Sequence, residues 1–365
     1  MFDEASKDGP IYLDYAATTP VSERVAAVVN HYMTVEFGNS GSRTHEWGTR
    51  AKKAVAEARA YLAFTMDASP EELIFTSGAT ESNNLAILGL AEYGRETGRM
   101  HLVTSATEHK AVLEPMEHLA KQGFEVDFLR PGPSGRFSVE DIMSNVREDT
   151  LLVSLMHVNN ETGVMQPIAE LAEALVETKT YFHVDAAQGF AKYPEDLRSA
   201  IDLISFSGHK IGAPKGIGGL LLRRRGWSVP PLAPITFGGG QERGLRPGTL
   251  PVPLVAGLST AVEEFAAARD AWVVRVSDCS TTLLQSLETL GAEVNGSASM
   301  FRAPNILNIA VNGRDSESFL LEHRGDWAVS VGSACTSSVY KSSHVLAAMG
   351  LAMERIERSI RFSFY

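Results

Sequence analysis

Short apolar runs alternate with amphipathic stretches over the first two thirds of the chain. The runs HLVTSAT, TLLVSLMHV, TYFHVDA and DLISFSG have the length of strands, and each ends in polar residues. Between several of them apolar residues recur at helical spacing, as in IAELAEALVET at residues 168–178. Strands and helices in this order predict an α/β fold in which helices cover both faces of a mostly parallel sheet.

The pattern changes near residue 257. Residues 238–253, GGGQERGLRPGTLPVP, are too rich in Gly and Pro for a regular element, and the long helical pattern LVAGLSTAVEEFAAARDAWVVRV follows them. Further along, strand-like runs such as NILNIAV indicate a second, smaller α/β unit. We therefore predict a large domain of residues 16–257 and a small domain of residues 1–15 and 258–365.

Composition narrows the class of protein. The chain has 365 residues, 44% of them hydrophobic and 21% charged, as expected of a soluble globular protein. No apolar run is long enough to cross a bilayer, and the first residues, MFDEASKDGP, lack the order of a signal peptide. We expect a cytoplasmic protein without membrane contact. The net charge of -11 disfavours direct binding to nucleic acid, which needs clustered Lys and Arg.

Polar residues follow several predicted strands, and in a parallel sheet such ends meet at one edge. The strand ELIFTSG turns into a helix with Ala79 and Thr80 at its start, where free N–H groups and a hydroxyl can bind a phosphate. His109 follows one strand, and residues 159–161 (Asn, Asn, Glu) follow another. Each of these features alone is more often an ordinary turn than a ligand site.

Asp185 and Lys210 indicate a ligand site more strongly than these turns do. Asp185 ends an apolar strand, where a buried carboxylate requires a cationic partner, and Lys210 follows another strand 25 positions later in SFSGHKIGAPKG. A desolvated lysine can form a Schiff base, and a carboxylate can pair with a pyridinium nitrogen. Together with a turn that can hold phosphate, these residues predict a site for pyridoxal 5′-phosphate. The sequence suggests no metal site.

The chain has two cysteines, Cys279 and Cys335. They have no metal-ligand spacing and are too few for a disulfide framework, so both should be free thiols. Cys279 lies within a helical pattern, which favours a packing role. Cys335 lies in VGSACTSS, within residues 330–343, where bulky apolar side chains are scarce and a moving loop is expected. Position alone leaves Cys335 open as either a buried hydrophobe or a nucleophile.

Several motifs along the chain are similar to those of a known enzyme family. YLDYAATTP, FTSGATESNNLAI, TEHKAVLE, MHVNNETGV, SGHKIGAPKGIG, ERGLRPGTLPV, GSACTSS and SIRFS run in order from Tyr12 to Ser363. The chain resembles the cysteine desulfurases of the class V aminotransferase group, in the NifS/IscS-like branch with a long cysteine loop. The resemblance implies a homodimer with the fold-type-I pyridoxal-phosphate transferase fold, in which the small domain carries the cysteine loop at about 330–343.

The implied reaction converts L-cysteine to L-alanine and places the sulfur on an enzyme cysteine as a persulfide. A sulfur-acceptor protein then receives it, for iron–sulfur assembly, tRNA thiolation or DNA phosphorothioation. Three departures from the family pattern, Ser40, Gly212 and Pro247, suggest a side branch rather than the housekeeping iron–sulfur enzyme, with DNA phosphorothioation as the candidate pathway.

The resemblance also assigns roles to residues. Lys210 would be the Schiff-base lysine, Asp185 the pyridinium partner, and Cys335 the sulfur acceptor. Around the cofactor, Gln188 would contact the phenolic oxygen, Asn160 would lie by the ring, and His109 would stack on it and carry protons. The phosphate would be held by Ala79, Thr80, Ser207 and His209, together with Thr249 of the partner subunit. The substrate carboxylate would be bound by Asn39 and Arg361.

Two other functions compete with this one. The first is another pyridoxal-phosphate enzyme of the same fold, such as a selenocysteine lyase or an aminotransferase, which alanine formation from cysteine would distinguish. The second is a non-catalytic sulfur-relay subunit that has kept the fold. The pairing of Lys210 with Asp185 argues against the second.

Overall fold

The computed structural model describes residues 9–288, 291–297, 299–313, 315–331 and 342–365. Within these residues a central sheet is built from β2 (Leu73–Thr76), β3 (His101–Ser105), β4 (Glu125–Leu129), β5 (Thr150–Met156), β6 (Tyr181–Asp185), β7 (Leu203–Ser207) and β8 (Gly218–Leu222). Its strand order is β2-β8-β7-β6-β5-β3-β4. Neighbours from β7 to β4 are parallel, and β8 is antiparallel to β7 and β2. The predicted mostly parallel α/β sheet is confirmed.

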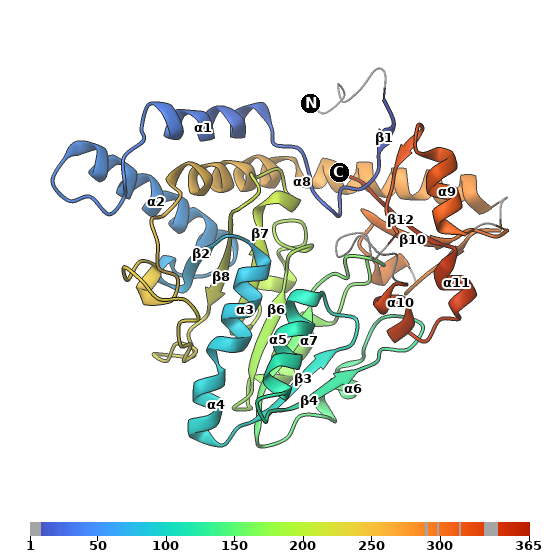
Figure 1. The fold of residues 1–365 in the computed structure, drawn as a ribbon, viewed down its shortest axis with the longest axis horizontal. Helices are drawn as coiled ribbons and strands as arrows, with labels where there is room; N and C mark the ends of the chain where they lie inside the picture. Colours follow the sequence, from blue (N-terminus) through green and yellow to red (C-terminus); the bar gives the residue numbers. More distant parts are fainter. Residues whose placement is uncertain (1–8, 289–290, 298, 314, 332–341) are drawn as a thin grey trace.

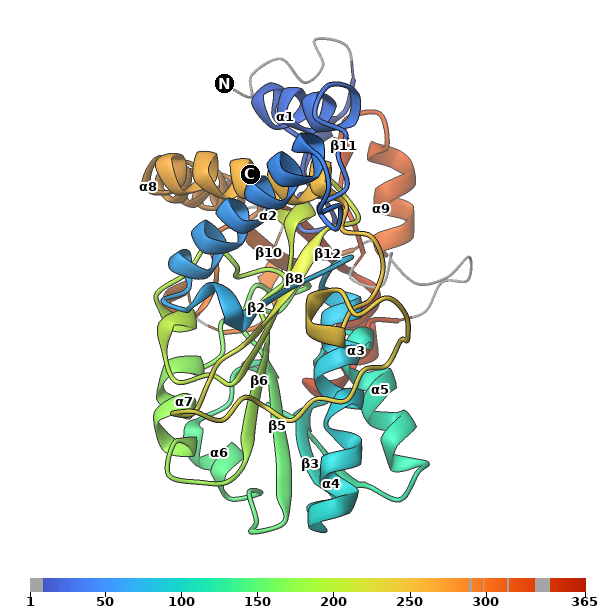
Figure 2. The same ribbon diagram turned by 90° about the vertical axis from the view of Figure 1, so that its left-hand side faces the viewer.

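Helices cover both faces of this sheet (Figure 2). In this part of the chain they are α1 (Glu23–Thr34), α2 (Glu46–Thr65), α3 (Ala79–Gly89), α4 (Ala91–Thr97), α5 (Lys110–Ala120), α6 (Val139–Met143), α7 (Ile168–Leu175) and α8 (Val252–Glu288). Successive side chains of a strand face opposite sides. Ile74 therefore packs with Leu85 of α3, whereas Phe75 packs in a second cluster with Leu171 of α7 and Val262 of α8.

A smaller unit lies at one end of the sheet (Figure 1). It contains β1 (Ile11–Tyr12), β9 (Glu293–Val294), β10 (Ile306–Ala310), β11 (Trp327–Ala328), β12 (Ser359–Ser363), α9 (Ser316–His323), α10 (His344–Ala348) and α11 (Met353–Glu357). Its strands form a sheet of order β12-β10-β9 and the parallel pair β1-β11. Residues near the start of the described chain thus pair with a strand of its last third, and the domain bounds stay a prediction.

Helix α8 connects the two units. Its first half contributes Val255 and Val262 to the core beneath the large sheet, and its second half contributes Trp272 and Val276 to the core of the smaller unit. The helix is continuous across Gly257, so the division at residue 257 remains a prediction. No helix among the described residues is long and apolar enough to span a membrane.

Cys279 lies on α8, as the helical pattern predicted, but its side chain is exposed. The expected packing role is therefore wrong. Helical periodicity shows that a residue is in a helix, but in a helix as long as α8 it does not show which side is covered along each turn. An exposed Cys279 thiol is a useful internal comparison for Cys335, which lies outside the described residues.

Candidate active site

The predicted functional residues gather at one edge of the large sheet. Strands β2, β3, β5, β6 and β7 all run toward this edge, where a cavity of about 630 Å³ opens. Ten predicted site residues line it: Ala79, Thr80, His109, Asn160, Asp185, Gln188, Ser207, His209, Lys210 and Arg361. This is the position at which open parallel sheets bind their ligands.

Three predicted residues are not placed in this cavity. Asn39 is exposed, and its side-chain oxygen accepts a hydrogen bond from the Gly41 N–H at 2.8 Å. Thr249 is also exposed and lies outside the lining, so its assignment depends on a partner subunit. Cys335 lies outside the described residues. The roles of all three stay predictions.

The start of α3 forms one end of the cavity. Gly78, just before the helix, has φ +147°, a conformation that side chains other than glycine rarely adopt. A Cβ on neighbouring Gly218 would lie 2.7 Å from the Gly78 Cα, so the two backbones can approach only because residue 218 is glycine. Ala79 and Thr80 begin the helix, and the unpaired N–H groups of a helix's first turn attract an anion. This end of the cavity can therefore bind a phosphate.

Lys210 enters the cavity from the short turn that follows β7 (Gly208–Lys210). Its Nζ donates hydrogen bonds to the backbone oxygens of Ala16 and Ala17, the latter at 2.8 Å. The same segment is fixed to the turn by Thr19, whose N–H donates to the His209 carbonyl at 2.9 Å. The lysine amine is thus held at the cavity by residues 16 and 17.

Asp185, at the end of β6, is almost fully buried. Its Oδ1 accepts the Ala187 N–H at 2.9 Å, and its Oδ2 accepts a hydrogen bond from Asn83 Nδ2 at 2.7 Å. Sequence analysis did not single out Asn83. The sequence did contain an indication of it, because Asn83 lies three residues after Thr80 and therefore on the same side of α3.

His109 and His209 in the cavity are both shifted toward the neutral form. Burial lowers the pKa of His109, and the positive charge of Lys210 acts in the same direction, while Asp185 opposes it. His109 Nδ1 accepts the Ala111 N–H at 3.1 Å and thereby caps α5. Burial also lowers the pKa of His209 to about 4. A neutral His109 is able to accept a proton in the cavity.

Arg361 reaches the cavity from β12 of the smaller unit. Its guanidinium donates to Asp14 Oδ1 at 2.6 Å and to the Asn160 carbonyl at 2.9 Å. The side chain is almost fully buried, and its Nε has no hydrogen-bond partner among the described residues. A buried cation with remaining donor capacity suits an anionic ligand such as a carboxylate.

Further polar residues complete the wall of the cavity. Glu161 lines it and accepts a hydrogen bond from the Ser343 hydroxyl. His344 also lines it and bonds through Nε2 to the Glu108 carbonyl at 2.9 Å. These contacts join segments that are 182 and 236 positions apart. Linear spacing gave no signal for them, and sequence analysis missed His344 and Glu108.

Glu108 is fully buried beside the site. Its Oε1 accepts the Met156 N–H at 2.7 Å, and its Oε2 has no partner among the described residues. Burial raises the pKa of Glu108 well above its ordinary value, and the negative charge of Asp185 adds to this effect. The folded chain therefore keeps Glu108 protonated over a range in which the unfolded chain ionises it.

This difference predicts a pH effect on stability. Because the folded pKa is raised, unfolding is increasingly favoured as pH rises above the ordinary carboxyl pKa of about 4.3. Glu108→Gln cannot titrate, so it should lose less unfolding free energy between about pH 5 and about pH 8 than the wild type does. Urea unfolding at both pH values measures this loss. The control is Glu114→Gln, at an exposed position of helix α5, which begins two residues after Glu108. Equal losses in wild type and Glu108→Gln would contradict the prediction.

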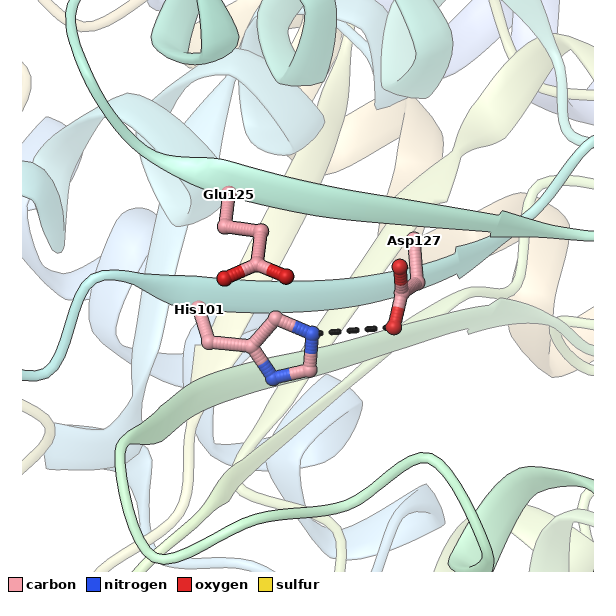
Figure 3. Close-up of side chains that lie close together, drawn as sticks. All are labelled: His101, Glu125 and Asp127. Carbon is pink, nitrogen blue, oxygen red and sulfur yellow. Dashed lines mark hydrogen bonds and ion pairs between the residues drawn. The ribbon is translucent and has the colours of Figure 1, made fainter.

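A second polar cluster lies on β3 and β4, the last two strands in the order of the large sheet. Glu125 and Asp127 on β4 lie beside His101 on β3 (Figure 3). His101 Nε2 lies 3.1 Å from Asp127 Oδ2, and Arg147 donates to both oxygens of Glu125 at 2.8 Å. Each of the two carboxylates therefore already has a hydrogen-bond partner, Arg147 for Glu125 and His101 for Asp127. The cluster is an ion-paired network that joins neighbouring strands, and we assign no ion to it.

The cavity residues fit pyridoxal phosphate. Beside the phosphate cradle at α3, the buried Oε1 of Gln188 and Nε of Arg361 have no partner among the described residues. Buried polar atoms without partners are rare in folded proteins and mark places where a ligand completes the bonding. The amine of Lys210 and the carboxylate of Asp185 are groups of the kind that could bind the carbonyl and the ring nitrogen of this cofactor.

Comparison with known proteins agrees with this geometry. The model of the aminotransferase class-V family matches residues 11–365. The cysteine desulfurase IscS of Neisseria gonorrhoeae is 44% identical over 359 residues, which cover 97% of this chain and 87% of the relative.

Two solved structures have the same fold. The crystal structure of DndA from Streptomyces lividans is 58% identical, with a TM-score of 0.84, over 96% of this chain and 99% of that one. SspA in complex with cysteine is 37% identical, with a TM-score of 0.82, over 97% of this chain and 98% of the other. The chain therefore belongs to the aminotransferase class-V family and, within it, to the cysteine desulfurases, a family that depends on pyridoxal phosphate.

Proposed function

We propose that this cavity holds pyridoxal phosphate and L-cysteine and that Cys335 takes the sulfur. The observation that carries the proposal is that Lys210, Asp185 and Arg361, from three separate elements, line one cavity. The lysine would bond to the cofactor's carbonyl carbon, the aspartate would bind its ring nitrogen, and the arginine would bind the substrate carboxylate. The related SspA structure, which was solved with cysteine, supports a cysteine substrate.

The cofactor would be held as follows. The first turn of α3, with Ser207 and His209, would bind the phosphate. Asp185 would accept the ring N–H, and Gln188 would contact the phenolic oxygen. Asn160 and His109 would lie against the ring. When bound, the cofactor supplies an electron sink for the carbon atoms of the amino acid. Lys210 would carry it covalently and give it up to the amino group of cysteine.

The substrate carboxylate would bind Arg361, and Asn39 would assist if its segment moves toward the cavity. Lys210 and His109, which both line the cavity, would be the bases that accept and return protons at the substrate carbons. The thiolate of Cys335 would attack the substrate sulfur, and the Cβ–S bond would break. Its electron pair stays with the carbon and takes up a proton, which gives L-alanine, while Cys335 becomes a persulfide.

The position of Cys335 in the chain supports this step. The described residues on either side of its segment lie at the site, because the Ser330 backbone pairs with Arg361 and Ser342 lines the cavity. Cys335 lies five positions after the first and seven before the second. His109 would be the base that helps to form its thiolate.

The proposal extends to partners and location. We propose a cytoplasmic homodimer in which Thr249 of the partner subunit joins the phosphate site, since Thr249 is exposed and lies away from the cavity of its own chain. The persulfide would pass to an acceptor protein. The departures Ser40, Gly212 and Pro247, together with the greater identity to DndA than to IscS, support an acceptor outside housekeeping iron–sulfur assembly.

Arg361→Lys tests the substrate assignment. Lysine keeps the charge but lacks the planar fork and the Nε donor, so the KM for L-cysteine should rise about tenfold or more while the cofactor content stays normal. The assay measures alanine formed from L-cysteine.

Arg358→Lys is the matched control, because Arg358 lies near the same strand but contacts Glu354 and Asn312 instead of the cavity. An unchanged KM in Arg361→Lys would place the substrate carboxylate elsewhere. Absence of alanine formation by the wild type would contradict the proposed function as a whole.

A further inference from the structure

Asn83 is a buried amide in contact with the carboxylate of Asp185. Its side chain is fully buried, and its Nδ2 donates to Asp185 Oδ2 at 2.7 Å. The second carboxylate oxygen accepts the Ala187 N–H at 2.9 Å. One hydrogen bond at each oxygen restrains rotation of the Asp185 carboxylate about its Cβ–Cγ bond. Each oxygen keeps one further lone pair for a ligand in the cavity.

The helix that carries Asn83 is itself fixed. Ser82, the preceding residue, donates from its hydroxyl to the Gly219 carbonyl at 2.9 Å and lies 2.8 Å from the Thr76 hydroxyl. These contacts anchor the first turn of α3 to β8 and β2. Helix α3 therefore places its N-terminal N–H groups at one end of the cavity and the Asn83 amide, one turn later, against Asp185.

Packing alone does not explain an amide at position 83, whereas its hydrogen bond to Asp185 does. Asn83 Oδ1 is buried and has no hydrogen-bond partner among the described residues. A buried polar atom without a partner lowers stability, and an apolar side chain of the same shape would avoid that loss. What only the amide provides at this position is the N–H donor. Turning the amide over would replace the donor with Oδ1 and lose the hydrogen bond to Asp185 Oδ2, so this contact also fixes the amide's orientation.

A second carboxyl group, Glu108, has fewer donors. It lies near enough to Asp185 to interact with its charge, and it receives a single N–H, from Met156. Burial raises the pKa of Glu108 well above its ordinary value. Asp185 instead receives one donor at each oxygen, from the Asn83 amide and from the Ala187 N–H.

We propose that Asn83 is a positioning residue for Asp185: its amide holds this carboxylate in the orientation that binds the ring N–H of the cofactor. This inference rests on the proposed function, since it takes pyridoxal phosphate as the ligand of the cavity. It assigns to α3 a role at both ends of the cofactor. Loss of the amide should weaken the cofactor's ring-nitrogen contact and leave its phosphate contacts in place.

The test compares pyridoxal phosphate with its 1-deaza analogue, in which C–H replaces the ring nitrogen. Apoenzymes of the wild type, Asn83→Leu and Asn83→Ala are titrated with each compound, and the ratio of the two Kd values is measured. The wild type should prefer the natural cofactor by about tenfold or more, because the contact is a hydrogen bond to a charged group. Both variants should show a preference at least about threefold smaller.

Asn84→Leu is the matched control. Asn84 is the next residue of α3, and its side chain bonds to the Thr80 carbonyl of its own helix, away from Asp185. It should keep the wild-type ratio. Circular dichroism confirms that each variant is folded, and Asn83→Ala avoids the added bulk of leucine.

Each outcome decides between the claims. A wild-type ratio in the Asn83 variants, or an equal loss of affinity for both compounds, would show that Asn83 acts on packing alone and would overturn the proposal. If the wild type itself bound neither compound, the proposed function would fail instead. A smaller ratio in both Asn83 variants but not in Asn84→Leu supports the positioning role.

Discussion

Lys210→Ala should purify without covalently attached pyridoxal phosphate and should lose at least about a thousandfold in alanine formation, which corresponds to about 4 kcal/mol of barrier. Lys210 lines the cavity, and its Nζ donates hydrogen bonds to the carbonyls of Ala16 and Ala17. Alanine has no amine to form the linkage. The measurement is the visible absorbance of the purified protein, together with its mass after borohydride reduction.

Two nearby lysines make this a demanding test. Lys215 also lines the cavity, and burial together with the positive charge of Lys210 lowers the pKa of Lys192 to about 7, which makes it a potential nucleophile. If Lys210→Ala still formed a reducible linkage of normal absorbance, one of these lysines would be the carrier. Lys215→Ala is the control and should keep the cofactor covalently bound.

Cys335→Ser should keep its cofactor and lose alanine formation by about a thousandfold. Serine has nearly the same size, but its hydroxyl is scarcely ionised at neutral pH and is a poor nucleophile toward sulfur. The steps at Lys210 do not use the thiol, so added L-cysteine should still change the absorbance spectrum. Alanine formation and the spectrum, measured on the same sample, separate the two stages.

Cys279→Ser is the matched control for this prediction. The Cys279 thiol is exposed on α8, so any reaction with accessible thiols in general would depend on it as well. It should retain wild-type activity. Wild-type activity in Cys335→Ser with loss in Cys279→Ser would reverse the assignment.

Sequence reasoning located this site through residues at strand ends. Asp185 and Lys210 could be paired in advance because parallel strands place their carboxyl ends at one edge, whatever the details of the helices between them. The same reasoning brought His109 and Asn160 to the cavity. Arg361, which comes from the smaller unit, was reached through the family resemblance alone.

What sequence reasoning missed depends on contacts between distant segments. Asn83 was overlooked because its role appears only when α3 lies against the end of β6, 102 positions away. Glu108 and His344 meet across 236 positions, with no regular spacing to indicate it. The exposure of Cys279 was mispredicted for a related reason: which side of a long helix is covered depends on the elements packed against it, and the helical pattern does not name them.

The most direct test of the account is the fate of the substrate's sulfur. Wild-type protein is treated with L-cysteine without reductant, digested, and analysed by mass spectrometry. The peptide containing Cys335 should gain about 32 Da, the mass of one sulfur atom, because thiolate attack on the substrate sulfur leaves a persulfide. The peptide containing Cys279 should be unchanged, and alanine should form in equal amount. Added sulfur on Cys279, or alanine formed with no sulfur on Cys335, would contradict the account.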